Sequence, residues 1–319
     1  WRVAAGRSLA WARAAASGYP GYVEKYWSPG LARRLAAAVE RFAPQAIQVE
    51  YFQLSLYAQA LGRWRAARPA GGGPPPRLVL NSHELGSLPR RRRAAAARNP
   101  LERAWLAHQA ARWERLQVAA TSWVDATLCV TEQDRQILAA LGGERCLTVP
   151  LGIDTEAVRP VWAPPPGPPK LLFVGSFGHR PNREAAKFLI DKVWPRIAQY
   201  HGSARLVLAG RGSDAFIEAL GRMDERVTAT GYVEDLTGLF RECHAFVAPL
   251  TEGGGIKIKI LEAMARGIPV VTTPIGAEGI VASAEDALSV APPDATFAET
   301  MIRALAEPER ARRFEKARA

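Results

Sequence analysis

The sequence contains few cysteines and no long apolar run, and both absences narrow its class. Only three cysteines, Cys129, Cys146 and Cys243, occur in 319 residues. Spacing this wide forms neither a disulfide framework nor a cysteine metal motif, so we expect small core residues in a reducing compartment. No stretch of about 18 apolar residues is present, and the sequence therefore predicts no transmembrane helix.

The chain also lacks a starting methionine and a signal peptide. It begins at Trp1 and stops within arginine-rich, helix-like sequence at Phe314–Ala319. We therefore expect a fragment of a longer protein, from which any targeting segment has been separated.

Positive charge is concentrated in the first half of the chain. The formal net charge is +11, and residues 1–160 supply +10 of it through 22 Lys/Arg against 12 Asp/Glu. Part of this excess is the run Arg90–Arg93. A basic face attracts nucleic acid, anionic lipid or phosphorylated substrates. The excess of Arg over Lys and the abundance of Ala equally indicate a compositional bias without a binding role.

A Pro/Gly-rich stretch at residues 163–169 marks the clearest boundary. Such a cluster continues neither a helix nor a central strand and is typical of a stiff linker. We therefore expect a first domain at 1–162 and a second at 170–319. A further Gly/Pro cluster, Ala70–Pro76, is expected to be a surface loop within the first domain.

Beyond the linker, short apolar runs alternate with amphipathic segments, which predicts a parallel sheet with helices on both faces. The expected strands are Lys170–Val174, Arg205–Ala209, Val227–Ala229, Ala245–Ala248 and Pro269–Thr272. The expected helices are Glu184–Tyr200, Asp214–Arg222 and one that includes Leu261–Ala265. Ligands of such sheets bind beyond the carboxyl ends of the strands, which points to the loops after Val174, Ala209 and Ala248.

The first half is less regular but has the same ingredients. Apolar runs at Ala46–Glu50, Arg77–Asn81 and Thr127–Val130 predict strands, and Pro100–Ser122 predicts a helix. We expect a second α/β domain whose opening strands are missing.

One segment has the composition of a phosphate site. A predicted strand is followed by Gly253, Gly254 and Gly255, then by Lys257 and Lys259, and then by a helix that contains Glu262. Glycines allow close approach of the backbone to an anion, and a helix N-terminus binds phosphate. Glu262 would accept hydrogen bonds from ribose hydroxyls. The alternation at Ile256–Ile260 is also typical of a half-buried strand with solvated lysines.

This segment resembles the nucleotide-sugar site of glycosyltransferase family 4. Further segments resemble the family in the same order along the chain, over roughly Ile47 to Ser283. The matching residues are Asn81–Glu84, Thr131–Asp134, Val149–Asp154, Phe173–Ser176, Arg180–Asn182, Thr230–Val233, Gly253–Gly255, Lys259, Leu261–Ala265, Gly267, Pro269–Val271, Thr273 and Gly276–Gly279. The resemblance implies an α/β protein of GT-B architecture: two Rossmann-like, doubly wound domains facing a cleft, with the first domain incomplete here.

The resemblance also implies the site residues. The implied catalytic residues are His83, which would contact the donor sugar, and Glu252. The implied donor-binding residues are Gly175, Arg180, Asn182, Tyr232, Val233, Gly253, Gly254, Gly255, Ile256, Lys257, Lys259, Leu261 and Glu262.

The sequence departs from the family pattern at three positions. Many members carry a glutamate where Gly254 stands, and Glu252 lies two residues out of that register. Pro181 replaces a lysine that often follows the phosphate-contacting arginine, and Leu151 replaces a common asparagine. We infer that Lys257 or Lys259 supplies the lost positive charge, so that alanine at either position weakens nucleotide binding.

The resemblance implies transfer of a hexose from a nucleoside diphosphate sugar to a hydroxyl, with retention of anomeric configuration, without a cofactor and without a metal. The first domain would bind a glycan or lipid-linked acceptor. A cytoplasmic location is expected, with peripheral contact to an anionic membrane surface.

Three alternatives stay open from the sequence. A nucleotide-sugar epimerase of the same architecture would need acid/base carboxylates, for which Glu252 and Glu84 are the candidates. A basic nucleic-acid-binding protein is supported only by the charge of the first half, without an interleaved aromatic pattern or a docking motif. We therefore expect no nucleic acid as a partner. The third alternative is a truncated chain that binds nucleotide but transfers no sugar.

Overall fold

The computed structural model describes residues 13–68, 73–158, 165–221, 224–280 and 288–305. The chain divides into two compact units, Trp1–Leu151 and Gly152–Ala319, which we call unit 1 and unit 2. Four expected features lie outside the described residues. They are the end of the first domain at 162, the start of the linker at 163, the first loop residues 70–72 and the terminus Phe314–Ala319.

Unit 1 contains a four-stranded parallel sheet in the sequential order β1-β2-β3-β4. Its strands are β1 (Ala46–Glu50), β2 (Arg77–Asn81), β3 (Ala126–Cys129) and β4 (Cys146–Thr148). Its helices are α2 (Gly21–Glu24), α3 (Pro29–Phe42), the short η1 (Phe52–Leu54), α4 (Ser55–Ala66), α5 (Ser87–Ala96), α6 (Pro100–Thr121) and α7 (Glu132–Ala140). The three strands expected here are confirmed within one residue at each end, and β4 was missed.

Local sequence explains where the longer helices of unit 1 begin. Side chains of Ser28, Asn99 and Thr131 accept hydrogen bonds from backbone N–H groups in the first turns of α3, α6 and α7. Prolines follow the first two of these caps at the first helical position, where a missing N–H costs nothing. Their apolar faces, with Leu78 and Leu80 of β2, form one buried cluster.

Unit 2 contains a six-stranded parallel sheet in the order β10-β9-β8-β5-β6-β7. Its strands are β5 (Lys170–Val174), β6 (Arg205–Ala209), β7 (Val227–Ala229), β8 (Ala245–Ala248), β9 (Val270–Thr272) and β10 (Leu288–Val290). Its helices are α8 (Arg180–Phe188), the π-helical η2 (Leu189–Val193), α9 (Trp194–Tyr200), α10 (Ser213–Leu220), α11 (Thr237–Glu242), α12 (Ile258–Ala265) and α13 (Ala295–Leu305). The expected strands are confirmed, whereas β10 was missed.

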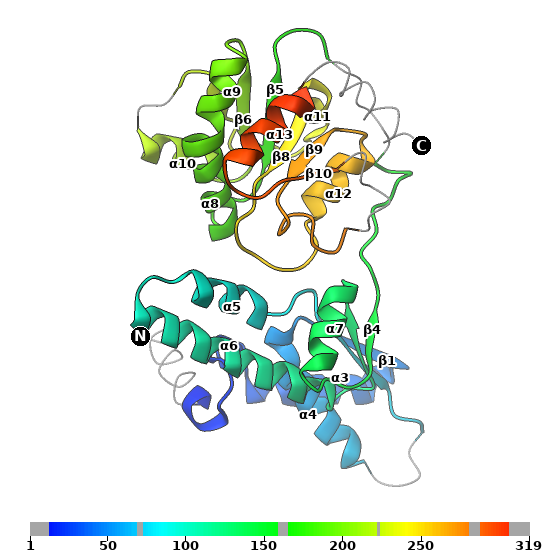
Figure 1. Ribbon diagram of the computed structural model, residues 1–319. Coiled ribbons are helices and arrows are strands. Elements are labelled where there is room, and N and C mark those ends of the chain that lie inside the picture. The colour runs from blue at the N-terminus through cyan, green and yellow to red at the C-terminus, as the bar shows by residue number, and fades with distance from the viewer. Residues whose placement is uncertain (1–12, 69–72, 159–164, 222–223, 281–287, 306–319) are drawn as a thin grey trace. The chain divides into compact units, whose positions relative to one another are not determined.

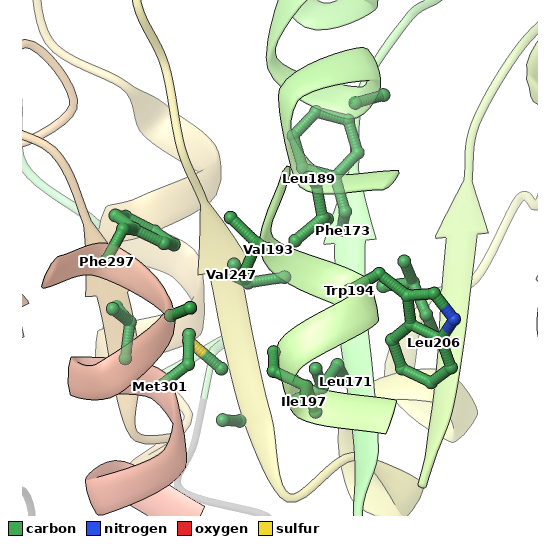
Figure 2. Packing of buried hydrophobic residues seen from close by; sticks show 14 of the residues in the cluster. Leu171, Phe173, Leu189, Val193, Trp194, Ile197, Leu206, Val247, Phe297 and Met301 are labelled. Atoms are coloured by element: carbon green, nitrogen blue, oxygen red, sulfur yellow. The ribbon is translucent and has the colours of Figure 1, made fainter. Parts of the chain in front are cut away.

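Helices cover both faces of the unit 2 sheet, as Figure 1 shows for α9 and α13 on one side and α12 on the other. One face packs Leu171 and Phe173 of β5 against Leu189, Trp194 and α13 (Figure 2). The other face packs Leu172 and its neighbours against α11 and α12. Alternate residues of β5 thus face opposite layers, as buried parallel strands require.

Two helix expectations need correction. The segment expected as one helix, Glu184–Tyr200, begins earlier, at Arg180, and contains the π turn η2. Pro195 follows η2 and has no N–H to donate to an earlier turn, which is a common reason for irregular helix geometry. The strand alternative for Ile256–Ile260 is wrong, because α12 begins at Ile258.

Candidate functional site

The strand order of unit 2 reverses next to β5, which has β6 on one side and β8 on the other. Chains leave two neighbouring strands in opposite directions at such a point and open a crevice at the carboxyl edge. The loops that follow β5 and β8 carry several of the expected donor residues. The fold thus brings Gly175, Arg180 and the glycines 253–255 to one edge of one sheet.

The loop after β5 is packed closely against the next strand end. The Gly175 amide donates to the Ala209 carbonyl at 2.9 Å, and the Gly210 amide donates to the Gly231 carbonyl at 2.8 Å. A Cβ atom at Gly210 would lie 2.1 Å from the Gly175 carbonyl oxygen. Glycine at 210 is therefore required by the close approach of β5 and β6 at the carboxyl edge.

The helix that follows this loop, α8, offers its N-terminus to the same edge. His179 occupies the N-cap position without a side-chain hydrogen bond to the helix, and Pro181 lies in the first turn. Unpaired N–H groups at a helix start bind anions. Arg180, at the first position of α8, has a side chain that is 48% exposed, so its guanidinium is accessible to a ligand.

Arg180 is held by carboxylates on two different elements. Its Nε lies 3.1 Å from Oε1 of Glu252 in the loop after β8 and 3.8 Å from Oε1 of Glu184 in α8. The Glu252 side chain is 14% exposed. The pair therefore joins the loop after β5 to the loop after β8, and it gives Glu252 a role in positioning the arginine.

Lys259 lies beneath these loops. Its ammonium donates to the Val174 carbonyl at 2.9 Å and to Oδ1 of Asn182 at 2.8 Å. Asn182 Nδ2 in turn donates to the Ser176 carbonyl at 2.9 Å. Burial, and next the charge of Lys257, lowers the pKa of Lys259 to about 7. Lys259 thus connects α12, α8 and β5, and its side chain lies inside the protein.

This burial predicts a pH dependence of stability. An unfolded lysine has a pKa near 10.4, so between about pH 7 and 10 the unfolded chain binds more protons than the folded one. Folding stability therefore rises with pH in this window. We expect wild type to gain roughly 1 kcal/mol per pH unit over Lys259→Met. Urea unfolding from pH 7 to 9.5 checks this, and parallel curves for the two proteins would contradict it.

Lys257 precedes α12 and stabilises the glycine loop. Its ammonium donates to the Gly254 carbonyl at 3.2 Å and lies 3.9 Å from Oε2 of Glu278. Gly253 and Gly255 have φ values of +126° and +65°, a region that side chains disfavour. Both lysines suggested to replace a missing cation are thus engaged with the protein in this structure, and Arg180 is the more exposed cation.

The remaining expected donor residues lie on neighbouring elements. Ile256 and Leu261 flank the start of α12, and Glu262 of this helix pairs with Arg266 at 3.0 Å. Tyr232, followed by Val233, comes after β7 and is 67% exposed. The Arg211 guanidinium lies 5.6 Å from the Tyr232 ring centroid. Arg211 was not predicted as a site residue, although it lies in the loop after β6, one of the three loops to which the sequence pointed.

His83 lies in unit 1, in the loop after β2, and has two partners that the sequence did not predict. Its Nε2 lies 2.5 Å from Oε2 of Glu50, and its ring stacks on Tyr51 at 3.9 Å between centroids. Burial raises the pKa of Glu50, but hydrogen bonds from His83 and Gln48 outweigh it, so the pKa lies below its usual value. Tyr51 and His83 both have positive φ, at 65° and 55°.

Positive φ at non-glycine residues costs free energy and clusters at functional sites. Glu50 ends β1, Tyr51 follows it, and His83 comes after β2, so the parallel pairing of these strands brings the three together. The arrangement fixes the orientation of the His83 ring.

Two arginines of the run Arg90–Arg93 have a structural role. Arg90 donates to the Gly86 carbonyl at 2.6 Å and lies 4.8 Å from the Trp113 ring, and Arg91 pairs with Glu114. Two of these four arginines therefore join α5 to α6. Among the described residues, no helix has the length and apolar composition to cross a bilayer.

Two glycosyltransferase family models match the chain, one in each half. The family model described as Glycosyltransferase Family 4 matches residues 4–157, and that described as Glycosyl transferases group 1 matches residues 168–307. A curated relative from Klebsiella pneumoniae, an uncharacterized 44.6 kDa protein in the cps region, is 27% identical over 140 residues. That match spans 41% of this chain and 36% of the relative, about a third of its length.

Solved structures of low sequence identity share the fold. Sucrose-phosphate synthase from Thermosynechococcus elongatus has a TM-score of 0.67 at 19% identity, and the match covers 93% of this chain and 74% of the synthase. Trehalose 6-phosphate synthase from Burkholderia multivorans has a TM-score of 0.64 at 16% identity, and the match covers 93% of this chain and 71% of the synthase. Anabaena HepE in complex with UDP has a TM-score of 0.62 at 16% identity, and the match covers 89% of this chain and 76% of HepE. The expected GT-B fold is confirmed, and the chain belongs to the glycosyltransferases, with a Family 4 region followed by a group 1 region.

Proposed function

We propose that this protein transfers a hexose from a nucleoside diphosphate sugar to a hydroxyl acceptor, with retention and without a metal. The main support for this proposal is that the α8 N-terminus, the glycine loop and exposed Arg180 meet at the carboxyl edge of β5 and β8. The leaving diphosphate gains negative charge in the transition state, and preorganised N–H donors and cations lower that barrier. In this proposal Arg180 and the backbone of residues 253–255 have that role.

Uridine diphosphate is our first choice of donor nucleotide. It is supported by the solved complexes of the structurally similar HepE with UDP and with UDP-glucose. In the proposal Glu262 accepts from the ribose hydroxyls, and Tyr232 and Val233 border the base. The acceptor, a glycan or a lipid-linked glycan, binds unit 1, and His83 contacts the donor sugar.

Peripheral attachment to an anionic membrane on the cytoplasmic side is a further part of the proposal. It is supported by the charge excess of residues 1–160. The epimerase alternative receives no specific support, because Glu252, one of its two candidate carboxylates, pairs with Arg180 at 3.1 Å.

Calorimetric titration of the purified chain with UDP, GDP and ADP tests the donor site, once with magnesium and once with EDTA. We expect micromolar binding of UDP that is equal in both buffers and about tenfold weaker in Arg180→Gln, because one charge-assisted hydrogen bond is lost. Arg196→Gln is the matched control, since Arg196 is 51% exposed and pairs with Glu299 at 3.7 Å. A folded sample that binds none of the three nucleotides would refute the proposal.

A double-mutant cycle tests whether Glu50 acts through His83. We expect Glu50→Gln alone to slow hydrolysis of the donor sugar by about tenfold, because the imidazole loses a charge-assisted hydrogen bond that orients it. In a His83→Ala background the same change should have no further effect. UDP release without acceptor is the measurement. Independent, additive effects of the two substitutions would show that Glu50 does not act through His83.

A further inference from the structure

Three half-exposed tyrosines of unit 1 lie beside its carboxyl sheet edge. Tyr51 follows the last residue of β1, and Tyr22 and Tyr26 belong to α2 and the turn after it. The helix α2 packs against η1, the turn that begins directly after Tyr51. The exposed fractions are 48% for Tyr22, 41% for Tyr26 and 45% for Tyr51. These rings contribute little to the core of unit 1.

The first two tyrosines are held in a fixed pair. The Tyr22 and Tyr26 rings meet edge to face at 5.2 Å, and the Tyr26 hydroxyl donates to the Tyr22 hydroxyl at 3.2 Å. Buried Tyr57 donates its hydroxyl to the Tyr26 carbonyl at 2.6 Å and accepts from the Ser28 amide at 3.0 Å. The backbone that presents the pair is therefore fixed by the core beneath it.

Polar groups surround these rings. Tyr22 lies close enough to Arg90 and Glu84 for both charges to act on its hydroxyl. Arg90 is itself fixed by Gly86 and Trp113. Next to them, Tyr51 stacks on His83, which contacts Glu50. We define the tyrosine face as Tyr22, Tyr26, Tyr51, His83, Glu84 and Arg90.

A sugar ring is the ligand that this combination fits. Pyranoses have an apolar C–H face that packs on aromatic rings, and a rim of hydroxyls that both donate and accept. Tyrosine offers a rigid ring with a polar tip, carboxylates accept from hydroxyls, and guanidinium donates to them. The carboxylates Glu50 and Glu84 disfavour a phosphate at the same place, whether of a lipid or of a nucleic acid.

We propose that the tyrosine face is the acceptor subsite and that its ligand is an uncharged saccharide, which packs its C–H face on one ring of the Tyr22–Tyr26 pair and contacts the other ring with its rim. The assignment of this ligand as the acceptor rests on the proposed transferase function. The saccharide itself is recognised by the residues of unit 1, independently of the nucleotide.

Binding of the fluorescently labelled full chain to a broad array of immobilised mono-, di- and oligosaccharides tests this, with UDP present. For a saccharide that binds, titration followed by saturation-transfer NMR then compares variants. We expect Tyr22→Ala and Tyr26→Ala to weaken its binding at least tenfold and Tyr22→Phe to weaken it less, because the ring is kept. Tyr200→Ala is the matched control, since Tyr200 is 73% exposed in unit 2.

UDP affinity and thermal unfolding of each variant separate the possible failures. Saccharide binding that is equal in Tyr22→Ala, Tyr26→Ala and Tyr200→Ala overturns the proposal, as does a chain that binds UDP and no saccharide. Binding to phosphatidylglycerol vesicles that is lost in Tyr22→Ala would also overturn it and would assign the face to lipid. If the chain binds no UDP but binds a saccharide in a tyrosine-dependent way, the transferase function is refuted and the saccharide subsite is retained.

Discussion

Alanine at position 210 is expected to lower the free energy of unfolding of unit 2 by about 3–5 kcal/mol. Two costs add, because the φ of +125° disfavours a side chain and the new methyl group would lie 2.1 Å from the Gly175 carbonyl oxygen. Left-handed strain and overpacking each cost about 1–3 kcal/mol. Relief of the contact requires β5 and β6 to separate at the carboxyl edge, so UDP binding should be weakened as well.

Pulsed hydrogen exchange of peptides from β5 and β6 along a urea series measures this effect, because it reports on unit 2 alone. Gly238→Ala is the matched control, because Gly238 lies in helix α11 and a Cβ atom added there would meet nothing within 4 Å. Alanine there should stabilise the protein by about 0.5–1 kcal/mol. Equal unfolding midpoints for wild type and Gly210→Ala would show that the loop after β5 moves without cost.

Glu262→Gln is expected to weaken UDP binding by about 100-fold. In the proposed function its carboxylate accepts from ribose hydroxyls, and hydrogen bonds to a charged group contribute about 1.5–3 kcal/mol each. The amide keeps the shape of the side chain but replaces one acceptor oxygen by a donor. Calorimetry with UDP and with its 2′,3′-dideoxy analogue locates the loss, because the analogue keeps the base and the diphosphate but has no ribose hydroxyls.

Two controls separate ligand contact from structural support. Arg266→Gln breaks the 3.0 Å ion pair with Glu262 but leaves the carboxylate in place. Glu242→Gln removes a carboxylate that pairs with Lys170, at the opposite end of β5, at 2.6 Å. We expect UDP affinity to change less than threefold in both. If Arg266→Gln weakened binding as much as Glu262→Gln, the glutamate would act by supporting α12.

Much of unit 2 was predictable because its sequence pattern has one physical solution. Runs such as Leu171–Val174 are apolar at every position, as parallel strands covered on both faces must be, and they end at glycine. The glycine at 210 was visible in the sequence as the end of a strand. The reason for it, the carbonyl of Gly175 on a neighbouring strand, depends on the distance between strand ends, which a local pattern does not contain.

Side-chain direction was predictable to a smaller extent. The alternation around Lys257 and Lys259 fits two solvated lysines on a strand as well as a helix start. In the structure both ammonium groups bond to carbonyl oxygens, and Lys259 is buried. The partnership of Glu50 with His83, 33 residues apart along the chain, was missed for a similar reason, since it arises from the pairing of β1 with β2.

The position of β5 between β6 and β8 also sets the order in which the site is completed during synthesis. The ribosome releases the chain at about 5–20 residues per second, N-terminus first. The β5 loop and α8 are therefore present before Ala245, the residue that pairs with Leu171. A messenger truncated just before the codon for Ala245 would yield a chain without the glycine loop and with one edge of an apolar central strand open. Such products favour aggregation over partial activity.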